Sequence, residues 1–79
     1  SKGITQGRLG DGMKSILKLS KIKSFDDVAV LSEAVARNEG VIACQVSIEK
    51  NEISIVYDDY FLKEEDLIQS VEEAGFIVI

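Results

Sequence analysis

The 79-residue sequence contains no histidine, no proline and only one cysteine, Cys44. Without histidine, the commonest acid–base group of enzymes is missing, and we expect neither catalysis nor a cofactor. A single cysteine excludes an intramolecular disulfide, which fits a reducing compartment. No apolar run approaches the ~18–20 residues of a membrane span, and no secretory signal is present. We therefore expect a cytoplasmic protein without membrane insertion.

Positive charge is also scarce, since 9 basic residues face 14 acidic ones and the net charge is −5. Nucleic-acid binders normally present a basic surface to the phosphates, so this class is not expected. One basic cluster is an exception, because four lysines crowd into residues 14–23. The simplest interpretation of that cluster is a solvated strand edge.

The length fits one domain, and the first twelve residues differ from the rest. Residues 1–12 hold four of the six glycines and only two aliphatic residues. Such a segment buries too little surface to offset its chain entropy, so we predict a disordered leader. Met13 would be the natural start, with the leader as an added remnant, or alternatively a native flexible tail. The folded domain is then residues 13–79.

Hydrophobic periodicity predicts four strands and two helices in residues 13–79. Alternation of apolar and polar residues predicts strands at 14–22, 42–48 and 53–57, and the apolar residues 76–79 after Gly75 are predicted to form a last strand. Helical spacing predicts one helix between Ser24 and Gly40 and a second that ends at Gly75. The simplest way to bury these apolar faces is an α+β, ferredoxin-like βαββαβ sandwich: a four-stranded antiparallel sheet with two helices on one face.

Alternation also assigns a face to each residue of the second predicted strand. Ile42, Cys44 and Val46 share the side that we expect to face the core. Cysteine in such a place behaves as a small hydrophobe, although a leftover metal ligand or reactive thiol is the alternative. The polar turn that follows predicts a hairpin, with Asn51 at a positive φ.

Four short motifs resemble the heavy-metal-associated domains of copper chaperones and metal-pumping ATPases. They are Leu17–Leu19, Gly40–Val41, Tyr57–Asp58 and Ala74–Phe76. Gly40 follows Asp27 by 13 residues, and the intervals from Gly40 to Tyr57 and from Asp58 to Gly75 are both 17, without gaps against the family pattern. The resemblance covers residues 14–79 and implies the same βαββαβ fold.

The departure from the family falls on its metal loop, Gly-Met-Thr-Cys-x-x-Cys, against which residues 21–27 read KIKSFDD. Ser24 and Asp27 replace both thiolates, and Ile22 keeps the apolar character of the family methionine, which plugs into the core. Hydroxyl and carboxylate oxygens are hard ligands that cannot replace two sulfurs around Cu(I). We therefore expect no copper site.

The same residues have a structural explanation. Ser24 has the form of a helix N-cap, and the acidic residues after it suit the positive end of a helix. Binding of a hard metal ion by Ser24 and Asp27 is the alternative. Asp58, Asp59 and residues 64–66 form an acidic cluster that lacks the spacing of a calcium loop, so we expect it to cap the second helix.

Two function classes fit these observations. The first is a degenerate, monomeric heavy-metal-associated-like domain that acts as a protein-interaction or regulatory module in metal homeostasis or transport. The resemblance implies a partner such as a metal transporter or chaperone. The second is a dimeric ligand-sensing domain of the same topology. For the first class, the expected partner-binding residues are Lys21, Ile22, Lys23, Ser24, Phe25 and Phe76.

Overall fold

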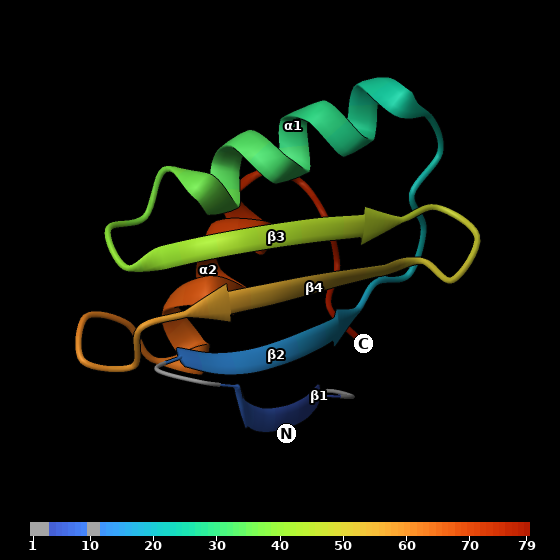
Figure 1. Cartoon of the computed structure of the whole chain (residues 1–79). Coiled ribbons are helices and arrows are strands. Elements are labelled where there is room, and N and C mark those ends of the chain that lie inside the picture. The colour runs from blue at the N-terminus through green and yellow to red at the C-terminus, as the bar shows by residue number, and fades with distance from the viewer. Residues whose placement is uncertain (1–3, 10–11) are drawn as a thin grey trace.

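The computed structural model describes residues 4–9 and 12–79. Their elements are, in chain order, β1 (Ile4–Leu9), β2 (Gly12–Lys18), α1 (Phe25–Ala36), β3 (Val41–Ser47), β4 (Glu52–Tyr57) and α2 (Glu64–Glu73). The strands form one antiparallel sheet in the order β1-β2-β4-β3, and both helices lie on the same face of it (Figure 1). Neither helix is long and apolar enough to cross a membrane, within the residues described.

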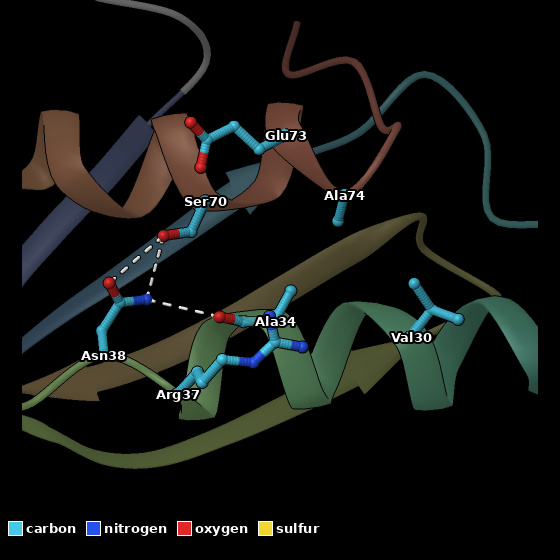
Figure 2. Close-up of a pocket in the computed structure, with 7 residues that line it drawn as sticks. All are labelled: Val30, Ala34, Arg37, Asn38, Ser70, Glu73 and Ala74. Carbon is cyan, nitrogen blue, oxygen red and sulfur yellow. Dashed lines mark hydrogen bonds between the residues drawn. The ribbon is translucent and has the colours of Figure 1, made fainter.

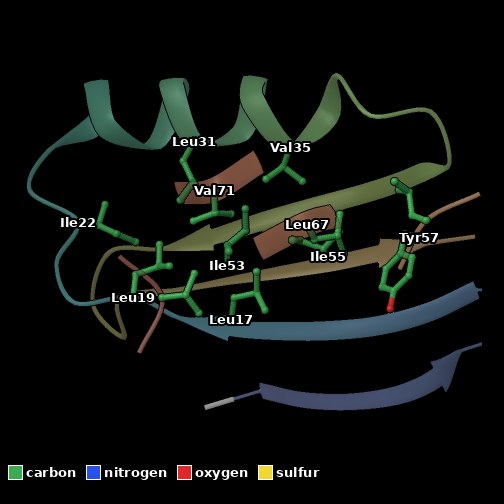
Figure 3. Close-up of a cluster of buried hydrophobic side chains, with 12 residues drawn as sticks. Leu17, Leu19, Ile22, Leu31, Val35, Ile53, Ile55, Tyr57, Leu67 and Val71 are labelled. Atoms are coloured by element: carbon green, nitrogen blue, oxygen red, sulfur yellow. The ribbon is translucent and has the colours of Figure 1, made fainter. Parts of the chain in front are cut away.

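The core lies between the sheet and the two helices (Figure 3). Strand β4 shows the alternation most clearly, since Ile53, Ile55 and Tyr57 are at most 2% exposed and the residues between them are not buried. Each helix contributes two fully buried residues from one face: Leu31 and Val35 from α1, Leu67 and Val71 from α2. These are the faces that the spacing of apolar residues predicted.

Three of the four predicted strands are present, and the fourth is not. Residues 76–79 make only an isolated antiparallel bridge, between Leu19 and Val78. The N–H of Ser20 donates to the carbonyl of Ile77, and the N–H of Ile79 to that of Lys18, both at 2.9 Å. This segment meets only the end of β2, because the rest of that edge is occupied.

The occupant is β1, so the prediction of a disordered leader is wrong for residues 4–9, while residues 1–3, 10 and 11 lie outside the described residues. Ile4 pairs with Leu17 and Leu9 with Gly12, so β1 follows β2 along its outer edge. An edge strand presents unpaired N–H and C=O groups, and any backbone can satisfy them. The prediction considered only apolar burial and missed this backbone pairing.

A second difference lies at the start of β3. The pairing of β3 with β4 shifts by one residue between Val41 and Ala43. Ile42 is consequently 61% exposed, whereas Val41 and Cys44 pack against the core. Placing Ile42 on the core face was therefore wrong, because a β-bulge adds one residue and breaks the alternation.

The turn residues agree with the prediction. Gly40, after α1, has φ 101°, and Asn51, in the hairpin between β3 and β4, has φ 52°. Both conformations lie in the left-handed region, which glycine adopts freely and asparagine tolerates. The hairpin places residues 48–51 at the same end of the molecule as the start of α1 (Figure 1).

Candidate functional site

The loop between β2 and α1 ends in a reciprocal helix cap, formed by Ser24 and Asp27. Ser24 is the N-cap of α1, and its Oγ accepts a hydrogen bond from the N–H of Asp27 at 3.3 Å. Asp27 returns the interaction, since its Oδ2 accepts from the N–H of Lys23 at 2.8 Å. Asp26 and Asp27 also lie in the first turn, where a carboxylate is stabilised by the helix dipole. The capping role expected of Ser24 is confirmed.

The cap bears directly on metal binding. Ser24 and Asp27 stand where the resemblance places two cysteines, and both side chains hold backbone N–H groups instead. Among the residues described, no group of three or more His, Cys, Asp or Glu side chains is placed to hold a metal ion. Ser24 and Asp27 therefore act as helix-capping residues, and the ligand atoms that they offer are hard oxygens.

The side chains of the loop divide into one that anchors and several that are exposed. Ile22 is 4% exposed and belongs to the core, as its correspondence to the family methionine implied. Lys21 and Lys23 on either side of it are exposed, and Phe25 is 85% exposed. Ile22 therefore anchors the loop in the core, whereas the side chains of Lys21, Lys23 and Phe25 lie in solvent.

The loop is fastened to the hairpin by Asn51. Its side-chain Oδ1 accepts from the N–H of Ile22 at 2.9 Å, and its carbonyl accepts from the N–H of Leu19 at 2.8 Å. The sequence indicated the positive φ of Asn51 but not these contacts with a loop about thirty residues earlier. A side chain that bridges two segments in this way leaves no local signal in the sequence.

The segment after α2 lies beside the loop, through the bond between Ser20 and Ile77. Phe76 is partly buried and packs against the core, so only part of its ring is available to a partner. Ile77, which was not among the expected partner-binding residues, is 62% exposed. Residues 76–79 are all apolar, so their sequence carries no signal for which of them faces solvent, whereas the structure buries Val78 and exposes the residues on either side of it.

Cys44 lies on β3, away from the loop, and is partly buried against the core. Its thiol donates to the carbonyl of Ser32 on α1 at 4.0 Å. Burial raises the pKa of the Cys44 thiol, and the bond to Ser32 partly opposes this. A protonated, half-buried thiol is a poor metal ligand and a poor nucleophile.

The acidic cluster caps the turn and helix at the other end of the molecule. Asp58 Oδ1 accepts from the N–H of Tyr60 at 2.9 Å, and Asp66 Oδ2 accepts from the N–H of Lys63 at 2.9 Å. Asp66 and the two glutamates before it form the first turn of α2. This is the capping role expected of these residues.

An open groove of about 360 Å³ runs between the two helices (Figure 2). The Nδ2 of Asn38 donates to the Oγ of Ser70 at 2.9 Å, and the same Oγ donates to Asn38 Oδ1 at 3.3 Å. Arg37 and Glu73 flank this pair, and Ala34 and Val30 line the α1 side. The polar groups at its centre bind one another, so the groove offers a ligand few free partners.

No protein-family model matches the sequence, and no curated protein matches it either. Solved structures do share the fold. The "CopZ metallochaperone" is 21% identical over 84% of this chain and 98% of its own, with a TM-score of 0.81. A copper binding domain from HMA7, a P-type ATPase, is 24% identical over 84% and 92%, with a TM-score of 0.78. A putative copper-ion-binding protein from Bacillus anthracis str. Ames is 16% identical over the whole of both chains, with a TM-score of 0.77.

These likenesses concern the fold, and they agree with the motifs in residues 14–79. The two helices and strands β2, β3 and β4 match the architecture of heavy-metal-associated domains. The chain has the fold of the heavy-metal-associated copper chaperones and metal-binding domains, and it has a single cysteine.

Proposed function

We propose that this chain is a cytoplasmic, monomeric protein-interaction or regulatory module linked to metal homeostasis or transport, without a Cu(I) site. The fold class supports the link to metal-handling proteins, because the similar structures include a metallochaperone and a domain of a P-type ATPase. The absence of catalysis belongs to the same proposal and agrees with these neighbours, which are carriers and binding domains.

One observation carries the proposal: Phe25 is 85% exposed at the first position of α1, directly after a loop whose backbone is held at Ile22 and Lys23. The cap formed by Asp27 fixes the loop at Lys23, and Asn51 fixes it at Ile22. A loop that is already ordered loses little conformational entropy when it binds. Exposed aromatic rings are frequent anchors at protein interfaces.

The docking face is defined as Lys21, Lys23 and Phe25 together with Ile77 and the exposed part of Phe76. The two lysines suit an acidic partner, whose approach they would accelerate by electrostatic attraction. A heavy-metal-associated domain of a P-type ATPase is the kind of partner that the fold suggests. Binding would use an aromatic anchor and charge in place of a shared metal ion.

The test compares wild type with the variant Lys21→Glu/Lys23→Glu and with Phe25→Ala. Proteins captured from a lysate are identified, and the association rate with each is then measured at two salt concentrations. We expect charge reversal to slow association and weaken its salt dependence, and Phe25→Ala to speed dissociation. Arg37→Glu, at the C-terminal end of α1 and outside the docking face, is the control, because the Arg37 side chain is 72% exposed. Capture of the same proteins at the same rates by all variants would rule this face out.

A further inference from the structure

The turn between β4 and α2, residues 58–63, presents two aromatic rings at the end of the molecule opposite the docking face. Tyr60 is 87% exposed and Phe61 is 54% exposed. Their ring centroids are 5.5 Å apart, with the planes inclined at 80°. We call this segment the aromatic turn.

The aromatic turn is held by hydrogen bonds that converge on Asp58. The carbonyl of Asp58 accepts from the N–H groups of Phe61 and Leu62 at 3.1 and 3.3 Å. Its side chain accepts from the N–H of Tyr60, and its own N–H donates to the carbonyl of Gly40 at 2.7 Å. Leu62, only 8% exposed, anchors the turn in the core. The two rings are therefore held outward on an ordered backbone.

The turn after α1 lies directly against the base of Phe61. A Cβ atom at Gly40 would lie 2.7 Å from the Cβ of Phe61, a separation too short for any side chain. The aromatic turn thus packs directly on the backbone at residue 40. This close approach fixes the base of Phe61 while its ring stays half exposed.

The charge around the rings indicates what they can bind. Residues 58–66 contain five carboxylates and one lysine, whereas residues 18–27 at the docking face contain three lysines and two aspartates. Cations bind over the face of a tyrosine ring, with about 0.5–2 kcal/mol of stabilisation. Carboxylates around such a ring attract lysine and arginine and repel acidic segments.

We propose that the aromatic turn is a docking site for a lysine- or arginine-rich segment of a partner protein. A guanidinium or ammonium group stacks on Tyr60, and the surrounding carboxylates, such as Glu65, balance the remaining charge of the segment. This site is separate from the docking face and takes a partner of opposite charge. It does not depend on the proposed function of the other end.

The experiment uses an arginine-rich peptide, with a glutamate-rich peptide of the same length as the negative probe. Amide chemical shifts of the full chain are followed during titration, and the affinity is measured by fluorescence anisotropy of the labelled peptide. We expect shifts to centre on residues 58–66 and binding to weaken as salt rises. Tyr60→Ala should weaken the affinity by about 2- to 30-fold, while Tyr60→Phe, which keeps the ring, should retain most of it.

Two further variants separate the possible outcomes. Glu65→Gln should lower the association rate and the salt dependence, and Phe25→Ala at the docking face should change nothing. No binding by wild type at low salt, or shifts centred elsewhere, would overturn the proposal. So would equal affinity of Tyr60→Ala and wild type, since attraction would then be a matter of charge alone. Line broadening that depends on protein concentration without peptide would assign the turn to a second copy of the chain instead.

Discussion

The two ends of the molecule are ordered by the same kind of hydrogen bond but carry opposite charge. At the docking face, Asp27 and Asn51 accept backbone N–H bonds and hold the loop that carries Lys21 and Lys23, and Phe25 is exposed at the start of α1 directly after it. At the aromatic turn, Asp58 accepts backbone N–H bonds and holds a turn that exposes Tyr60 beside carboxylates. In both places a short polar side chain orders the backbone, and an aromatic ring is left in solvent.

The comparison teaches that a loop without two cysteines can be ordered by hydrogen bonds within the chain. In the family resemblance, the loop before the first helix holds the metal through cysteines. Here Ser24 and Asp27 stand at those positions and turn the loop into a well-capped helix start. Hydrogen bonds to backbone N–H groups order this loop, and the same kind of bond orders the opposite end.

The largest effect is expected from introducing two cysteines at positions 24 and 27. Ser24→Cys/Asp27→Cys should raise the affinity for Cu(I) by several orders of magnitude, because two thiolates at the start of α1 form a soft site. Competition against a strong Cu(I) chelator measures this, in a Cys44→Ser background as control. Wild type should leave the copper with the chelator. Stoichiometric capture by wild type, or no gain in the double variant, would contradict this account of the loop.

The next largest effect is the loss of stability caused by adding a side chain at Gly40 or Gly75, the two glycines with positive φ. Gly40→Ala combines a left-handed backbone, which costs about 1–2 kcal/mol, with contact against Phe61. Gly75→Ala, at the docking-face end, has the same φ of 101° and nothing within 4 Å of the added Cβ. Chemical denaturation should show Gly40→Ala as clearly less stable than Gly75→Ala. Equal losses would mean that the aromatic turn does not pack on residue 40 as described.

A smaller effect is expected at Asn51. Asn51→Gly keeps the positive φ but removes the acceptor for the N–H of Ile22, which should cost about 1 kcal/mol. The sharper readout is hydrogen exchange of the Ile22 amide, which should speed up. Asn51→Asp keeps an acceptor oxygen and should retain the protection. Unchanged exchange in the glycine variant would show that the loop is ordered by the cap alone.

The smallest effect concerns the thiol, which lies away from both ends. Burial raises the pKa of Cys44, so its reaction with a thiol reagent should be slow in native buffer and accelerate only at higher pH than for an exposed thiol. Because the folded state favours the protonated form, its contribution to stability should decrease as pH rises above the thiol's ordinary pKa. Ser24→Cys, exposed at a helix start, should react faster in a Cys44→Ser background. Similar rates for the two thiols would contradict the burial of Cys44.

Several features of the fold could be predicted from short stretches of sequence. The cap at Ser24, the left-handed Gly40 and Asn51, and the buried faces of both helices all depend on residues within a few positions of one another. The motifs that resemble heavy-metal-associated domains likewise needed only spacing. The exposure of Phe25 follows from its place at the first position of the capped helix, where its side chain points into solvent.

The sequence by itself determined the core, both helices, strands β3 and β4, and the absence of a second cysteine, because side-chain chemistry and periodicity specify these features. Only the tertiary structure decided which segment covers the outer edge of β2, how the bulge turns Ile42 outward, and that Asn51 binds the N–H of Ile22. Each of these depends on backbone groups brought together from distant parts of the chain. Backbone groups are nearly the same in every residue, so composition and spacing do not reveal which of them will pair.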